Sequence, residues 1–315
     1  MDLKKNAKKE LAWSSGNLLL YSILMLVSIL LVGIIEIILY KVQHGPGANL
    51  EEAKELLSDS MVGYFLAVVV GVLIFTVYKE GRLWTDYICH KGKKMTGKAF
   101  IVLLAFLYLG QFSFTLFANL VESLLNLVQL SWLTSIEAAS AGSTNWSMFL
   151  YAGILGPISE ELIFRGTILG SFKTYGKLYA LVMSAILFGL FHGNIPQGLF
   201  AFLVGLVFGY VALEYSIYWA IFLHIFNNLV IGDVMLWLLG YFPEDIATVI
   251  SLSLNIIGSG AGLFVLYKNK DRIREYIQEN QPEKGVFKTA LKSVWFWLFV
   301  VSMLFQGLFL ITKIS

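Results

Sequence analysis

The sequence predicts an all-α membrane protein: a polytopic bundle of about eight to nine transmembrane helices that forms a single integral membrane domain over residues 1–315. Hydrophobic residues make up 57% of the chain and charged residues only 14%, whereas soluble domains carry about 25% charged residues. Apolar runs long enough to cross a bilayer as helices recur along the whole chain. Because these runs are continuously apolar and do not alternate with polar residues, helices are favoured over the strands of a closed barrel.

The predicted spans follow one another along the chain. The first comes after the basic start MDLKKNAKKE; it is too long for a signal peptide and no small-residue cleavage site follows, so it is interpreted as a retained anchor. A charged stretch at 268–292 is interpreted as a solvated connector that contains a short surface helix. The predicted spans are 17–40, 62–78, 99–121, 146–170, 178–193, 197–213, 217–239, 247–267 and 293–312.

The distribution of lysine and arginine supports this arrangement. If the N-terminus is cytoplasmic and successive connections alternate between the two sides, all of the 23 basic residues except Lys41, Lys54 and Lys313 lie on the inner side. Such a bias agrees with the positive-inside rule. The sequence therefore predicts a protein of the cell membrane with a cytoplasmic N-terminus. Its net charge of +2 reflects this topology and gives no indication of nucleic-acid binding.

One predicted span contains three ionisable groups in the stretch ISEELIFRG, residues 158–166. A charge at mid-bilayer costs at least about 2.5–3.5 kcal/mol on insertion scales, so such groups face a polar interior. Glu161 and Arg165 are four residues apart on one helical face and are predicted to form a structural ion pair. Glu160 has no basic residue at the corresponding position, so its partner must come from elsewhere in the fold, or it must be protonated. Upstream, Gly156-Pro157 is predicted to interrupt the helix.

Further polar groups are predicted at a similar depth in neighbouring spans. His192 occurs in ILFGLFHGN and His224 in FLHIFNNLV, with Asn228 four residues later on the same face. The helical rise places Glu160 about 15 Å, His192 about 22 Å, His224 about 12 Å and Asn228 about 18 Å from the inner ends of their spans. Either histidine alone, or Asn228 alone, is also explained as an interhelical hydrogen-bonding residue. Taken together with an unpaired glutamate, they favour a functional site.

Three motifs within residues 146–239 resemble those of the CPBP family, which comprises the CAAX prenyl-protein endopeptidases and the bacterial Abi proteins linked to bacteriocin self-immunity. Glu160-Glu161-Leu-Ile-Phe-Arg165 is similar to the family's EExxxR motif. Phe188-Gly-Leu-Phe-His192 is similar to its FxxxH motif, and His224-Ile-Phe-Asn-Asn228 to its HxxxN motif. The order and spacing of the motifs also resemble the family pattern. The resemblance does not extend to the first three predicted spans or the last two.

The resemblance implies an intramembrane endopeptidase that hydrolyses a membrane-associated or lipidated peptide or protein in the bilayer. In the roles that the family implies, a water is activated by Glu160 with His192. His224 and Asn228 would stabilise the oxyanion. The supporting residues are Glu161, Arg165 and Phe188. No serine or cysteine lies beside a plausible base, so a covalent nucleophile is not indicated.

The residues are compatible with hydrolysis with or without a metal. Family members are often named metalloproteases, and Glu160, His192 and His224 are acceptable ligands for a divalent metal such as zinc. The HExxH motif is absent, however, and the candidate ligands lie on three helices. A glutamate-activated water explains the residues equally well, and the interpretation leans slightly toward no tightly bound metal.

Two other classes of protein also place polar groups in the membrane. A non-catalytic immunity or scaffolding protein would keep the fold without hydrolysis. A proton-coupled transporter would also need buried ionisable groups, but it would more often have repeat-related broken helices, which the sequence does not indicate.

Overall fold

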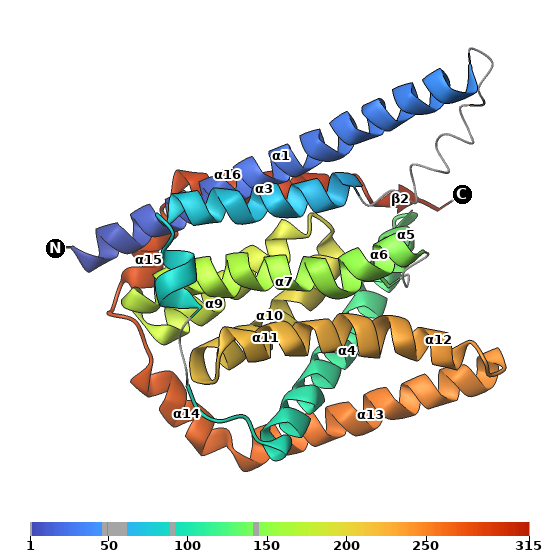
Figure 1. Ribbon diagram of the computed structural model, residues 1–315. Coiled ribbons are helices and arrows are strands. Elements are labelled where there is room, and N and C mark those ends of the chain that lie inside the picture. The colour runs from blue at the N-terminus through green and yellow to red at the C-terminus, as the bar shows by residue number, and fades with distance from the viewer. Residues whose placement is uncertain (1, 46–48, 50–61, 89–91, 141–144, 315) are drawn as a thin grey trace.

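The computed structural model describes residues 2–45, 49, 62–88, 92–140 and 145–314 as a bundle of helices (Figure 1). Its one pair of strands within these residues is short: β1 (Leu130–Ser131) pairs antiparallel with β2 (Thr312–Lys313). Within the described ranges, six helical segments are long and apolar enough to cross a membrane. These segments are α1 (Leu3–His44), α4 (Gly97–Asn126), Trp146–Tyr175, α10 (Ile195–Glu214), Ile217–Leu239 and α13 (Glu244–Lys268).

Three shorter apolar helices lie on the remaining predicted spans: α3 (Val62–Tyr78), α9 (Lys177–Phe191) and α16 (Val294–Leu308). An apolar helix therefore stands at each predicted span, which confirms the all-α membrane class. The count of nine spans stays a prediction, because α3 has 17 residues and α9 and α16 have 15 each. A helix that crosses the whole hydrocarbon core needs about 20 residues.

Two of the long segments are composite. Trp146–Tyr175 consists of α6 (Trp146–Leu150), the π-helix η2 (Tyr151–Leu155), α7 (Gly156–Glu161), the π-helix η3 (Leu162–Leu169), α8 (Gly170–Phe172) and the 3₁₀ turn η4 (Lys173–Tyr175). Ile217–Leu239 consists of α11 (Ile217–Ile225), the π-helix η5 (Phe226–Val234) and α12 (Met235–Leu239). The other short elements are η1 (Leu83–Tyr87), α5 (Leu133–Ser140), α14 (Lys270–Glu279) and α15 (Val286–Ala290).

Short polar residues between the apolar runs begin the helices. The side chains of Thr96, Asn145, Asn194, Ser216 and Ser293 each accept a hydrogen bond from a backbone N–H of the first turn that follows. Such a cap satisfies one of the donors that a helix leaves free at its N-terminus. The sequence marks where the spans begin with these residues.

Helices α9 and α10 form a tight hairpin inside the bundle. α9 ends at Phe191, His192 caps it, and Gly193 turns the chain at φ +60°, a conformation that favours glycine. A Cβ at Gly189 would lie 2.5 Å from the carbonyl oxygen of Gly198, so only glycine allows the two helices to approach this closely. His192 therefore lies at a helix end beside the turn and not within a continuous helix.

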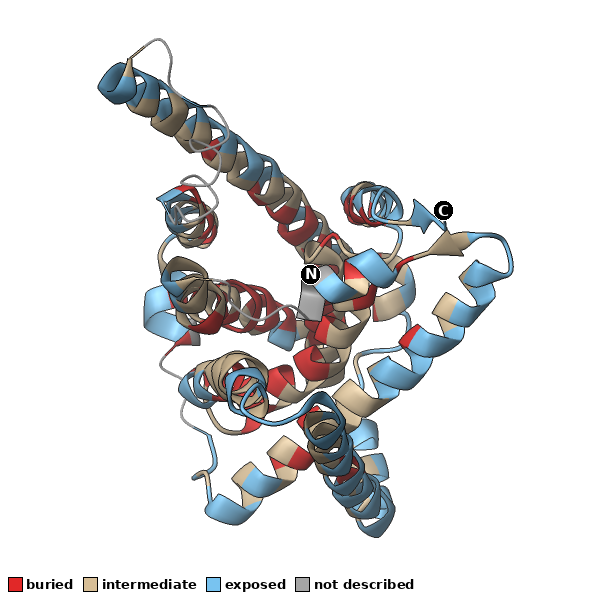
Figure 2. Ribbon diagram, turned by 90° about the vertical axis from the view of Figure 1, so that its right-hand side faces the viewer, coloured by how far each residue is buried: buried red, intermediate tan, exposed pale blue. Residues whose placement is uncertain are grey.

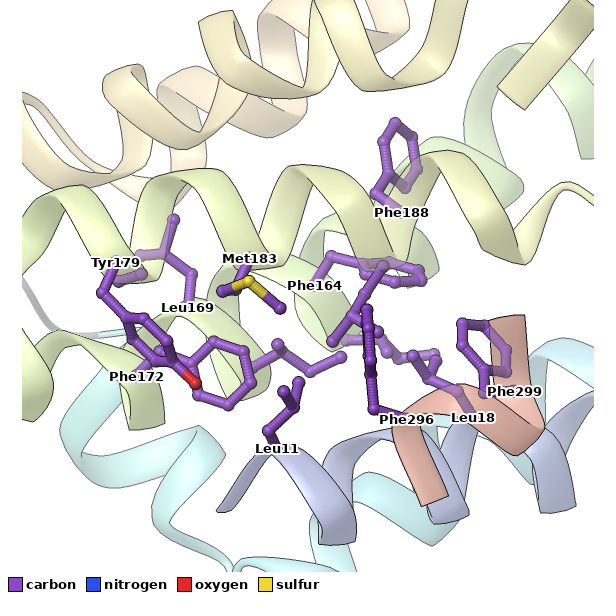
Figure 3. Close-up of a cluster of buried hydrophobic side chains, with 14 of the residues drawn as sticks. Leu11, Leu18, Phe164, Leu169, Phe172, Tyr179, Met183, Phe188, Phe296 and Phe299 are labelled. Atoms are coloured by element: carbon purple, nitrogen blue, oxygen red, sulfur yellow. The ribbon is translucent and has the colours of Figure 1, made fainter. Parts of the chain in front are cut away.

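The core of the bundle gathers around η3 and α9. Figure 3 shows aromatic and aliphatic side chains from η3, α9, α1 and α16 in this cluster, among them Phe164, Phe188, Leu18 and Phe299. Figure 2 shows that buried residues lie on the helix faces that point into the bundle, while the outward faces are exposed. Many of those exposed residues on α1, α13 and α16 are large and apolar, as a lipid-facing surface requires.

The connector between α13 and α16 packs against the bundle. Glu214 at the end of α10 accepts hydrogen bonds from Lys177 Nζ at 2.8 Å, Lys93 Nζ at 2.9 Å and Tyr276 Oη of α14 at 3.0 Å. Lys4 pairs with Glu283 at 2.8 Å. The predicted surface helix is present as α14. None of the residues of α14 is buried, in keeping with a solvated connector. The segment is also held to the bundle, by Tyr276 to α10, by Glu283 to α1 and by the Asn280 carbonyl oxygen, which accepts from the backbone N–H of Leu178 on α9 at 3.1 Å.

Candidate active site

The segment that carries the two adjacent glutamates is helical throughout but irregular. The sequence predicted an interruption of the helix at Gly156-Pro157. The segment stays helical there, but α7 is flanked by the π-helical segments η2 and η3. Ser159 Oγ donates a hydrogen bond to the Gly156 carbonyl at 2.9 Å. Single π-helical turns within α-helices often occur at functional sites, because they change which side chains face the interior. Here they place Glu160 and Glu161 toward α11.

Glu161 and Arg165 form the ion pair that their spacing predicted. Arg165 Nη1 donates to Glu161 Oε1 at 2.8 Å, and both side chains are wholly buried. Arg165 Nη2 also donates to the carbonyl oxygen of Gly205 on α10 at 3.1 Å. Its guanidinium carbon lies 4.2 Å from the centre of the Phe188 ring, within the range of a cation–π interaction. The pair therefore fixes η3 against both α9 and α10.

His224 connects the two glutamates. Its Nδ1 lies 2.9 Å from Glu161 Oε1, and its Nε2 lies 3.7 Å from Glu160 Oε2. The ring is stacked on Phe208 with centroids 4.6 Å apart. Glu160 thus has its partner on another helix, as its lack of a basic residue in its own helix required. Its side chain is 27% exposed, whereas that of Glu161 is fully buried, so the two adjacent carboxylates have different surroundings.

His192 is held by the motif residue four positions before it. The carbonyl oxygen of Phe188 lies 2.9 Å from His192 Nδ1, and the two rings meet edge to face. A carbonyl only accepts hydrogen bonds, so Nδ1 carries a proton and Nε2 of the neutral ring keeps a lone pair. The Phe188 ring also meets the His224 ring edge to face, with centroids 5.8 Å apart, so one phenylalanine contacts both histidines.

Asn228 lies at the edge of the cluster. Its Nδ2 donates to the carbonyl oxygen of Ala152 at 3.0 Å, and its Oδ1 accepts from Asn227 at 3.1 Å. The bond to Ala152 joins the π-helices η2 and η5. Asn228 therefore connects the helix of His224 to the helix of the glutamates, in keeping with the interhelical role that its residue type allows.

The residues present do not form a metal-binding group. Among the described residues, no three histidine, cysteine, aspartate or glutamate side chains converge as a ligand set. Nδ1 of His224 faces Glu161 and Nδ1 of His192 faces a backbone carbonyl, so Nε2 is the nitrogen of each ring that is open to a further partner. The suggested set of Glu160, His192 and His224 is not gathered into one ligand group in this arrangement.

Two contributors from α10 were not identified from the sequence. The carbonyl oxygen of Gly205 accepts a hydrogen bond from Arg165, and the ring of Phe208 stacks on that of His224. The stretch Gly205-Leu-Val-Phe-Gly209 is a GxxxG pattern, which is typical of closely packed membrane helices and was the available signal. A Cβ at Gly205 would lie 3.1 Å from Phe188 and 3.2 Å from Arg165.

Comparison with known proteins agrees with the motif resemblance. Residues 142–230 match the family model described as type II CAAX prenyl endopeptidase Rce1-like. This chain therefore carries an Rce1-like domain of the CPBP family over those residues, which include all three motifs. No curated protein and no solved structure matches the chain.

Proposed function

With an Rce1-like domain at 142–230 as the premise, we propose that the protein is an intramembrane endopeptidase. It hydrolyses a peptide bond of a membrane-associated or lipidated peptide or protein with a water activated at Glu160. The single observation that carries the proposal is the bridge from Glu160 through His224 to Glu161 and Arg165. A purely structural ion pair needs only Glu161 and Arg165. The partly exposed Glu160 and the second face of His224 remain available for chemistry.

Charge balance supports this division of roles. Two carboxylates and one guanidinium leave the cluster with one negative charge, and a low-dielectric site strongly favours neutrality. One proton held between Glu160 and His224 gives that neutrality. When the proton is on His224, Glu160 is an ionised general base and Nε2 of His224 is a hydrogen-bond donor. The proton count of the cluster therefore matches what the start of a hydrolysis requires.

The reaction then proceeds with conventional proton transfers. Glu160 takes a proton from a water whose second hydrogen is held by Nε2 of His192, and the oxygen attacks the substrate carbonyl carbon. Protonated His224 donates to the oxyanion that forms, and such a donor in a dry site contributes several kcal/mol to transition-state stabilisation. Glu160 returns its proton to the amide nitrogen, the carbon–nitrogen bond breaks, and an acid and an amine are released. Asn228 donates to the same oxyanion after it exchanges its bond to Ala152.

The test uses the purified full-length protein in detergent with a panel of lipidated and unlipidated membrane peptides, read by mass spectrometry. Wild type is compared with Glu160→Gln and His192→Ala, and with Glu122→Gln as a matched control. Glu122 bonds Ser131 and the backbone of Trp132, not the cluster, and glutamine keeps its acceptor oxygen. We expect cleavage by wild type and the control, and none by the two site variants. Cleavage by Glu160→Gln, or no cleavage by wild type, contradicts the proposal; the second result favours a non-catalytic membrane protein.

A further inference from the structure

Helix α1 lies outside the Rce1-like match, yet it delivers one polar side chain to the cluster. Tyr21 is only 5% exposed. Its ring is stacked on Phe191, with centroids 5.1 Å apart and planes at 21°, directly before His192 in the chain. The phenol lies within electrostatic range of the Tyr151 phenol and of Glu160. Helix α1 therefore brings a phenol against the end of α9 that carries His192.

The neighbouring helix α3 is shaped around this ring. A Cβ at Gly71 would lie 2.4 Å from Cζ of Tyr21, the ring carbon that bears the hydroxyl. Nothing larger than glycine therefore fits at this position while Tyr21 keeps its place. The stack on Phe191 from one side and the glycine surface from the other hold the phenol in a defined orientation.

The hydroxyl of Tyr21 has unused hydrogen-bonding capacity. The hydroxyl makes no hydrogen bond among the described residues. It also does not belong to the unpartnered side-chain atoms that are sealed from solvent, so it is still accessible. The other phenol at the cluster, Tyr151 of η2, has the same status and is in ring contact with Tyr64 of α3 at 4.9 Å. These hydroxyls are available to a molecule that enters beside Glu160.

The chemistry of a peptide substrate in the membrane gives such a hydroxyl a use. A peptide bond that is to be cleaved must be unwound from its helix, and the freed backbone carbonyl and N–H groups have no water to replace their partners. A fixed phenol satisfies one carbonyl at a small entropic cost. We propose that Tyr21 is a substrate-binding residue of the endopeptidase site, and that its hydroxyl donates a hydrogen bond to the backbone carbonyl adjacent to the scissile bond.

This inference rests on the proposed function and is tested with the peptide that the panel identifies. Tyr21→Phe keeps the stack on Phe191 and removes only the donor. We expect its kcat/KM to fall about tenfold, as for a buried acceptor left unsatisfied. Tyr108→Phe on α4 is the control for loss of a phenol away from the cluster, and it should keep wild-type kcat/KM.

A modified substrate separates binding from structural support. In a second peptide, the carbonyl next to the scissile bond is removed by a reduced amide. The kcat/KM of wild type should fall about tenfold on this peptide. The kcat/KM of Tyr21→Phe should not fall further, because this variant already lacks the hydroxyl that would bind the carbonyl. Equal losses in both proteins would show that Tyr21 does not bind this carbonyl and would overturn the proposal.

A displacement variant gives independent evidence. Gly71→Ala should displace the Tyr21 ring and lower kcat/KM at least as much as Tyr21→Phe. Gly33→Ala on α1, which has no atom within 4 Å of its new methyl group, should have no effect. Wild-type cleavage together with unchanged kcat/KM in Tyr21→Phe overturns this inference alone. No cleavage by wild type on any peptide overturns both the inference and the proposed function.

Discussion

Nδ1 of His224 and Oε1 of Glu161 lie 2.9 Å apart in the buried centre of the bundle, although the two residues are 63 positions apart in the chain. The same carboxylate oxygen accepts from Arg165. Glu161 is therefore the structural member of the glutamate doublet, and through His224 it orients the ring that faces Glu160. The two adjacent carboxylates thus differ in their surroundings, because only Glu161 is sealed from solvent.

The first prediction separates these tasks. Glu161→Gln leaves the fully buried Arg165 without its counter-charge, and breaking a buried pair on one side costs about 3–5 kcal/mol of folding stability. Glu160→Gln removes a partly exposed group and should leave the unfolding temperature close to that of wild type. Thermal unfolding in detergent, monitored by intrinsic fluorescence, measures both. Equal unfolding temperatures for the two variants would contradict the assignment.

The second prediction concerns the contact between Gly205 and the site. In Gly205→Ala the new methyl group would meet Phe188 at 3.1 Å and Arg165 at 3.2 Å, so the ion pair must shift. Overpacking of this kind typically costs about 1–3 kcal/mol. We expect a lower unfolding temperature and reduced cleavage. Gly260→Ala on α13, whose methyl group would meet nothing within 4 Å, is the control and should match wild type.

The third prediction concerns the bonds that hold α14. Glu214→Gln removes the charge that Lys93, Lys177 and Tyr276 share, so α14 should detach more often and be cut faster by added protease. The carboxylate of Glu214 raises the pKa of Lys93 above its ordinary value of 10.5. The stabilisation from this pair is therefore fully present at neutral pH, and at the alkaline end it is lost as pH rises through the raised pKa of Lys93. If added protease cuts α14 at the same rate in wild type and in Glu214→Gln at pH 7, Glu214 does not hold α14 to the bundle.

The fourth prediction concerns metal removal. Because no ligand set of three or more side chains converges among the described residues, cleavage should continue after treatment with a chelator and dialysis. Measurement of kcat/KM before and after this treatment, and after addition of zinc, tests the expectation. Activity that is lost with the chelator and restored by zinc would show that the side chains rearrange around a metal.

The sequence by itself determined the fold class of this protein and marked the polar residues that make up its candidate site. Continuous apolar runs can satisfy their backbone in a bilayer only as helices, so the fold class follows from composition. The spacing of Glu161 and Arg165 is a local property of one helix, and their ion pair followed from it. The positions of His192, His224 and Asn228 in apolar spans also marked them as unusual, because polar groups there are costly.

The tertiary structure decided which groups meet. That His224 faces both glutamates, that Gly205 and Phe208 enclose the pair, and that Tyr21 reaches the cluster from α1 are all contacts between helices. Helix periodicity does not encode such contacts, because the rotation and depth of each helix depend on the packing of its neighbours. The turn at Gly193 and the close approach of Gly71 to Tyr21 are likewise set by the backbone of a second helix, which no single segment of sequence contains.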